Sequence, residues 1–275
     1  MYTYIDNKEN LSFLNKELLG RPYVGLDTEF RRTNKNNMKL ALLQINDGDE
    51  IFLVDSLSIY DPSGCCDFLF SDSVIKILHS CKEDLEAIYA WTNKKMHKIF
   101  DTQLANSFLE KDYSISYQGL VEKKLGIVLE KKETRSNWLR RPLSDDQLKY
   151  AALDVEYLIH VYEEQISELS KTKKLAWHDQ DIEKLILNTF SDSSENLKID
   201  RILPRSEENG ILERFNIIVD QIAQKENINP TLFFSKKSQK DFLRSVISNG
   251  LEKASSEITI WRRDLIKDHL LDLLK

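Results

Sequence analysis

The sequence predicts an α/β domain with a mixed sheet, followed by a small domain made only of helices. Three observations support this fold class. Three strand-like apolar runs come first, further strands then alternate with helical patterns, and from about Glu207 the apolar spacing is helical throughout. Strands that alternate with helices favour parallel pairing, whereas strands joined by a tight turn favour antiparallel pairing. The sheet is therefore expected to contain both kinds of pair.

The first three strands are expected over residues 22–30, 38–45 and 50–55. The first run, PYVGLDTEF, is rich in β-branched and aromatic residues behind a proline. The turn sequence NDGD separates the second run, MKLALLQI, from the third, EIFLVD. Such a turn predicts a hairpin of antiparallel strands, which we place beside the first strand.

Strands and helices alternate in the next part of the chain. We expect a short helix after Pro62, a strand over 74–80, a helix over 82–91, a strand that ends near Phe100 and a helix over 116–125. Asp101 and Thr102 stand where residues that cap a helix are favoured. Gly126 supplies the left-handed residue that commonly follows the end of a helix.

A long helix is predicted from Ser144 towards Leu169. The run SDDQ is a capping box, in which the side chains of Ser144 and Gln147 bond backbone N–H groups at the helix start. Tyr150 and Asp154 are four residues apart in this helix, so they lie on the same face.

A further helix is expected over 176–190, and the polar run SDSSEN after it is the most linker-like stretch of the chain. The sequence therefore predicts three parts. These are an α/β domain over 1–170, a helical connector over 171–205 and a small helical domain over 206–275.

The composition is typical of a globular protein in a reducing compartment. Of the 275 residues, 41% are hydrophobic and 31% are charged, and the formal net charge is −6. The three cysteines, two of them adjacent, form neither a disulfide framework nor a zinc pattern. The sequence has no apolar run of membrane-spanning length, and its first residues lack the features of a secretory signal. We expect a cytoplasmic monomer with no membrane partner.

Two acids interrupt the first apolar strand. Because side chains alternate along a strand, Asp27 and Glu29 lie on the same face. Carboxylates beside a core are costly unless something neutralises them, and their oxygens suit Mg²⁺ or Mn²⁺. Asp84 begins a helix directly after a strand, where ligands collect in α/β sheets. The same position also suits an acid that only complements the helix dipole.

Four stretches together resemble ribonuclease D, in the DEDD family of 3′–5′ exonucleases whose third motif carries a tyrosine. They are DTE, HSCKEDLE, FDTQLANSFL and SNWLRRPLSDDQLKYAALDVEYL, and the resemblance covers about residues 23–177. It implies a ribonuclease H-like exonuclease domain with five catalytic residues: Asp27, Glu29, Asp84, Tyr150 and Asp154. The four acids would hold two Mg²⁺ or Mn²⁺ ions that hydrolyse a phosphodiester, and Tyr150 would position the attacking water. Asn137 departs from the family, where an acid is frequent.

The C-terminal region resembles the helicase-and-ribonuclease-D C-terminal (HRDC) domain over about 207–275. The run QIAQKENINPTLFFSKKSQKDFL carries most of this likeness. Such domains often bind nucleic acid, and Lys236 and Lys237 are expected on a basic face. A packing or protein-partner role is the alternative.

Residues 121–142 carry seven Lys or Arg side chains against three Glu, with a tryptophan among them. Basic side chains interleaved with an aromatic suit a single-stranded backbone and a stacked base. The predicted substrate contacts are Thr28, Phe30, His79, Arg135, Trp138, Arg140, Arg141, Lys236 and Lys237. The alternatives are a solvated loop around a buried tryptophan and a buried, hydrogen-bonded histidine. Gln44 is expected to be structural, and Asp101 to be a helix cap.

The resemblance implies a metal-dependent 3′–5′ exoribonuclease that releases nucleoside 5′-monophosphates. Its expected substrates are tRNA precursors or other structured RNA 3′ ends. A 3′–5′ exonuclease that acts on DNA is an alternative, because the same site cuts either nucleic acid. A non-catalytic RNA-binding protein is another, but it has no reason to keep four acids and a tyrosine near its core.

Overall fold

The computed structural model describes residues 1–34, 37–110, 112–129, 136–191 and 203–273. The chain divides into two compact units. The first contains Met1–Ala105 and Ile115–Glu168, and the second contains Asn106–Ser114 and Leu169–Lys275. The further division into a connector over 171–205 and an HRDC-like domain over 206–275 stays a prediction.

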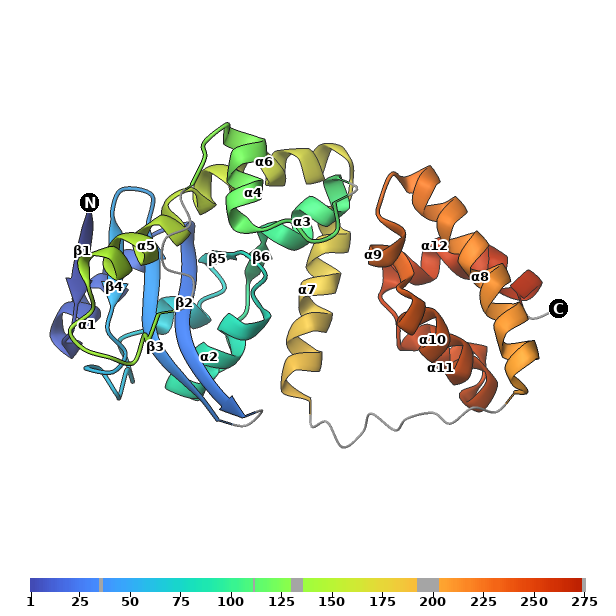
Figure 1. The fold of residues 1–275 in the computed structure, drawn as a ribbon, viewed down its shortest axis with the longest axis horizontal. Helices are drawn as coiled ribbons and strands as arrows, with labels where there is room; N and C mark the ends of the chain where they lie inside the picture. The colour runs from blue at the N-terminus through green and yellow to red at the C-terminus, as the bar shows by residue number, and fades with distance from the viewer. Residues whose placement is uncertain (35–36, 111, 130–135, 192–202, 274–275) are drawn as a thin grey trace. The chain divides into compact units, whose positions relative to one another are not determined.

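The first unit is built on one mixed sheet of six strands, in the order β1-β4-β3-β2-β5-β6 (Figure 1). The strands are β1 (Tyr2–Ile5), β2 (Tyr23–Asn34), β3 (Asn37–Asn46), β4 (Ile51–Val54), β5 (Ile75–Leu78) and β6 (Ile99–Asp101). β3 is antiparallel to β2 and β4, whereas the other neighbours are parallel. The predicted mixed sheet is confirmed, and only β1 was not foreseen among these strands.

The helices of the first unit mostly follow the prediction. They are α1 (Lys8–Leu18), α2 (Lys82–Thr92), α3 (Thr102–Leu109), which continues into the second unit, α4 (Tyr117–Leu125), α5 (Asp145–Glu156) and α6 (Leu158–Lys171). The helix expected after Pro62 is a single 3₁₀ turn over Asp67–Phe70. α1 was missed, although Asn7 caps it and Leu11, Leu14 and Leu18 are buried at helical spacing.

The predicted long helix from Ser144 to Leu169 is wrong in one respect, because it breaks at Tyr157. Asn46 donates hydrogen bonds from its amide to the carbonyl oxygens of Val155 and Glu156. The backbone N–H of Tyr157 in turn bonds the hydroxyl of Tyr117. These side chains satisfy backbone groups that a continuous helix would have paired internally.

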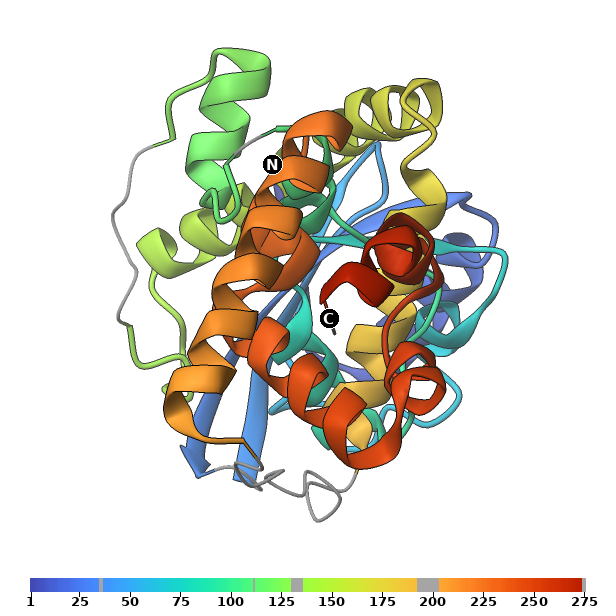
Figure 2. The ribbon, with the colours of Figure 1, turned by 90° about the vertical axis from the view of Figure 1, so that its right-hand side faces the viewer.

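The second unit is helical. It contains α7 (Leu175–Phe190), α8 (Arg205–Glu226), α9 (Pro230–Phe234), α10 (Lys236–Asn249), α11 (Leu251–Ser256) and α12 (Ile260–Leu273). α8 contacts α9, α10 and α12, and α12 also contacts α7 (Figures 1 and 2). In the described part of the chain, no helix is both long and apolar enough to span a membrane.

Trp261 is the centre of the aromatic core of the second unit. Its ring stacks on Trp177 of α7 at 4.9 Å, and Phe108 meets it edge-on at 5.4 Å. Trp261→Ala is expected to destabilise this unit by about 3–5 kcal/mol, because the lost ring leaves a cavity. Denaturant unfolding followed by circular dichroism measures this cost. Exposed Ile217→Ala is the control, and an equal cost in both variants would contradict the assignment.

Candidate active site

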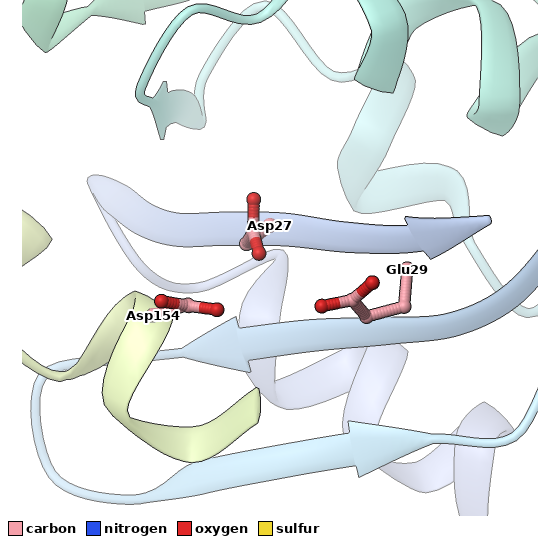
Figure 3. A group of neighbouring side chains, drawn as sticks. All are labelled: Asp27, Glu29 and Asp154. Carbon is pink, nitrogen blue, oxygen red and sulfur yellow. The ribbon is translucent and has the colours of Figure 1, made fainter. Parts of the chain in front are cut away.

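Three of the predicted carboxylates converge above the sheet. Asp27 and Glu29 extend from β2, and Asp154 reaches them from α5, which packs across β2, β3 and β4 (Figure 1). One carboxylate oxygen from each residue lies within 4.8 Å of the others. Figure 3 shows the carboxyl groups of Glu29 and Asp154 turned towards the space beside Asp27. The pairing that the alternation along β2 predicted is therefore present in the structure.

Local features of the sheet hold this group in place. The register of β2 against β3 shifts between Glu29 and Phe30, so a bulge follows the second acid directly. Such bulges re-aim side chains beside active sites. Opposite Asp27, the buried Gln44 of β3 places its amide nitrogen 3.4 Å from the Asp27 Oδ2 atom. Gln44 was expected to be structural only, although its place as the one polar residue within LALLQI marked it.

Asp84 lies beside the three-acid group but is not part of it. It is buried in the first turn of α2, and its carboxylate accepts a hydrogen bond from the Thr28 hydroxyl. Thr28 lies between Asp27 and Glu29 on β2, so this strand carries two of the acids and also the hydroxyl that bonds Asp84. Thr28, predicted as a substrate contact, is therefore bound to a predicted metal ligand.

The four carboxyl groups hold their protons to unusually high pH. Burial, followed by the charges of the other three acids, raises the pKa of Asp27 well above its ordinary value. Burial and the charges of Asp154 and Asp84 raise the pKa of Glu29 to about 8. Burial also raises the pKa values of Asp84 and Asp154 to about 7, although hydrogen bonds from Thr28 and Tyr150 oppose the rise.

The clustering of these buried acids and their raised pKa values fit a site for divalent cations. The donors are carboxylate oxygens, which are the ligands that Mg²⁺ and Mn²⁺ prefer. Enclosing several carboxylates together is unfavourable unless a cation balances their charge. Asp27, Glu29 and Asp154 would hold such ions, with Asp84 adjacent.

The raised pKa values predict that the metal-free protein loses stability with rising pH. The folded-state pKa values of Glu29, Asp84 and Asp154 are about 7 to 8 and exceed the ordinary carboxyl values near 4. The stability that these protonated groups contribute is thus fully present below about pH 4 and is lost as the folded groups ionise. We expect a lower Tm at pH 8 than at pH 6.5, by about 2–4 °C for each kcal/mol lost. Thermal unfolding in chelator measures this, and added Mg²⁺ should reverse the loss. A Tm that rises across this interval would contradict the prediction.

Tyr150 lies on the same face of α5 as Asp154, as its spacing predicted, and the two side chains interact electrostatically. The observed capping box of Ser144 and Gln147 starts this helix. Burial and the charge of Asp154 raise the pKa of the Tyr150 phenol above its ordinary value. The phenol is therefore protonated at neutral pH. Its ring packs against buried Trp138, with the ring centroids 6.1 Å apart.

Two further residues have partners within the protein. Asp101 caps α3 by accepting the backbone N–H groups of Gln103 and Leu104, which confirms the predicted cap. Its carboxylate also accepts the N–H groups of Ser80 and Cys81, which lead into α2. His79 bonds the Thr102 hydroxyl through Nδ1 and the Ile115 carbonyl through Nε2.

The other predicted substrate contacts are scattered. Phe30 is half-buried beside Glu29, and Arg140 is exposed. Arg141 is bound to Asp55 at 2.7 Å, which gives it a partner within the protein in place of the predicted contact. Arg135 lies outside the described residues. Lys236 and Lys237 are exposed at the start of α10, in the second unit.

Comparison with known proteins shows the family to which this chain belongs. A family model described as a 3′–5′ exonuclease matches residues 2–170. Ribonuclease D from Pseudomonas paraeruginosa is 38% identical over 190 residues, which are 69% of this chain and 50% of that protein. Ribonuclease D from Escherichia coli is 36% identical over 160 residues, 58% of this chain and 43% of that protein. The chain thus spans about half the length of the curated relatives it matches.

The fold is also shared with solved structures. The crystal structure of Escherichia coli RNase D, an exoribonuclease involved in structured RNA processing, has a TM-score of 0.68 at 24% identity. That match covers 100% of this chain and 73% of the other. Brucella melitensis NrnC with bound Mg²⁺ has a TM-score of 0.58 at 20% identity, over 70% of this chain and 96% of the other. The first unit has the predicted ribonuclease H-like exonuclease fold. The chain belongs to the 3′–5′ exonuclease family and, within it, is similar to ribonuclease D.

Proposed function

We propose that this chain is a metal-dependent 3′–5′ exoribonuclease that releases nucleoside 5′-monophosphates. The observation that carries the proposal is the convergence of Asp27, Glu29 and Asp154 within 4.8 Å, next to a protonated Tyr150. The three acids lie within residues 2–170, which the 3′–5′ exonuclease family model matches, and the curated relatives named above are ribonucleases D. Both findings support the proposal.

The carboxylates bind two divalent ions in this proposal, either Mg²⁺ or Mn²⁺. When bound, the two ions supply stabilisation of charge on both the attacking and the leaving oxygen of the phosphodiester. Asp27, Glu29 and Asp154 provide the shared ligand group, and Thr28 holds the carboxylate of Asp84 beside it. The bound Mg²⁺ of Brucella melitensis NrnC supports this assignment.

Tyr150 orients the attacking water in the same proposal. Its raised pKa excludes a phenolate base at neutral pH, so the hydroxyl acts as a hydrogen-bonding group. The hydroxyl lies on the same face of α5 as Asp154 and interacts with that carboxylate. Water held at a fixed place reacts faster, because the orientation has already been achieved on binding.

The proposed substrates are the 3′ ends of structured RNA, tRNA precursors among them, in the cytoplasm. The involvement of Escherichia coli RNase D in structured RNA processing supports this class. Phe30 beside Glu29 and the exposed Arg140 remain proposed contacts with the RNA end. The basic start of α10, with Lys236 and Lys237, is a proposed second contact with nucleic acid, and we propose a monomer.

The test is a time course on a 3′-extended tRNA labelled at its 5′ end, in Mg²⁺, Mn²⁺ or chelator. A ladder that shortens from the 3′ end only when metal is present supports the proposal. A DNA strand of the same sequence is run beside it, and preferential cleavage of the DNA would favour the DNA exonuclease. Intact RNA in both metals, with binding still seen by gel shift, would favour a non-catalytic RNA-binding protein.

A further inference from the structure

Arg141 stands out because every N–H group of its guanidinium is bonded inside the protein. A guanidinium has five such donors. Nε and Nη2 each bond an oxygen of Asp55 at 2.7 Å, and Nη2 also bonds the Ala41 carbonyl at 2.7 Å. Nη1 bonds the carbonyl oxygens of Trp138 and Arg140 at 2.7 and 3.0 Å. A phosphate would have to displace one of these bonds, so Arg141 is poorly suited to hold substrate.

Asp55 gives Arg141 a rigid anchor at the end of β4. Its side chain is 3% exposed, and it also accepts hydrogen bonds from the Tyr4 hydroxyl and the Leu57 backbone N–H. Burial alone would raise the pKa of Asp55, but the bonds from Arg141 and Tyr4 lower it to about 2. The pair is therefore ionised at neutral pH, and its bidentate geometry allows little rotation.

The anchored arginine bonds the segment that precedes α5. Residues 136–144 form neither helix nor strand, yet they lead directly into α5. The bond from Arg141 to the Trp138 carbonyl fixes this segment next to the sheet. Trp138 is 7% exposed, and its ring lies 6.1 Å from that of Tyr150, at an interplanar angle of 40°.

We infer that Arg141 is a positioning residue for Tyr150, acting through Trp138. The Asp55–Arg141 pair holds the indole against the phenol ring, and the packed ring keeps the hydroxyl beside Asp154. This inference deepens the proposed function. Only its expected effect on the rate of RNA cleavage rests on that function. The position of the phenol ring can be measured without catalysis.

The first measurement uses the metal-free full chain with 3-fluorotyrosine in place of Tyr150 and no RNA. Arg141→Ala and Arg141→Lys are both expected to move or broaden the ¹⁹F signal, since each lacks the guanidinium group that bonds the Trp138 carbonyl. Circular dichroism checks that each variant is folded. Arg141→Lys keeps the positive charge, so it is the variant to use if Arg141→Ala does not fold. Arg140→Ala, at the exposed neighbour, should leave the signal in place. An unchanged signal in folded Arg141 variants would overturn the inference, whether or not the protein cuts RNA.

The second measurement is a double-mutant cycle on a 3′-extended RNA in Mg²⁺. Arg141→Ala should lower kcat by about tenfold with little change in KM, as expected for a misplaced group. In the Tyr150→Phe background the same change should alter kcat by less than about twofold, because the affected hydroxyl is already absent. A raised KM would show that Arg141 binds substrate, and equal losses in both backgrounds would show that it acts independently of Tyr150. Either result would overturn the inference. If the unsubstituted protein cuts no RNA, the proposed function fails and the ¹⁹F result alone decides the position of the ring.

Discussion

Asp154→Asn is expected to abolish RNA cleavage in both Mg²⁺ and Mn²⁺. The substitution keeps the size of the side chain but removes one of the three carboxylates that lie within 4.8 Å of one another. An amide oxygen carries no charge, so the remaining acids hold divalent ions far more weakly. We expect a loss of at least about 10³-fold in kcat/KM, comparable to removing a main source of transition-state charge stabilisation.

The measurement is the initial rate of 3′ shortening at saturating metal, with metal binding followed by calorimetry in the absence of RNA. Asp146→Asn is the matched control, because Asp146 is an exposed acid in the first turn of the same helix. Asp146→Asn should keep both metal binding and turnover. Retained turnover by Asp154→Asn in either metal would remove Asp154 from the site.

Tyr150→Phe is expected to slow cleavage by about 100-fold while metal affinity stays the same. The variant keeps the ring that packs against Trp138 but loses the hydroxyl that interacts with Asp154. Because the phenol is protonated at neutral pH, its loss removes an orienting group and leaves the carboxylate charges intact.

Single-turnover cleavage at saturating metal, together with calorimetric titration of Mg²⁺, separates these two effects. Tyr60→Phe is the control, since Tyr60 is 87% exposed. Cleavage by Tyr150→Phe at the unsubstituted rate would show that the hydroxyl does not position the water. Weakened metal binding instead would assign Tyr150 to support of Asp154.

Much of the candidate site could be predicted because residues close together in the sequence determine which side chains share a face. Asp27 and Glu29 share a face through the alternation along β2, and Tyr150 and Asp154 share one through the helical repeat. Asp84 was predicted to belong to the site partly because it begins a helix directly after a strand. The sequence left open whether it only complements the helix dipole. In the structure the Asp84 side chain is buried beside the other acids, and the Thr28 hydroxyl bonds it.

Other assignments depended on contacts that no local pattern reports. The helix break at Tyr157 follows from Asn46 and Tyr117, which lie far back along the chain. Arg141 was predicted to meet substrate because it lies in a basic run. Its partner Asp55 is 86 residues away, directly after β4, which comes to lie nearby only when the sheet forms.

Local sequence patterns were enough to predict the strands β2 to β6 and the capped start of α5, whereas the resemblance to ribonuclease D implied which acids are the candidate catalytic residues. These features depend on side-chain periodicity and on hydrogen bonds within one helical turn, which neighbouring residues control. Where α5 ends, how Asp84 is held and whether Arg141 is free became clear only from the folded chain. Each of these depends on a buried polar group finding a partner, and burial arises from the packing of distant segments.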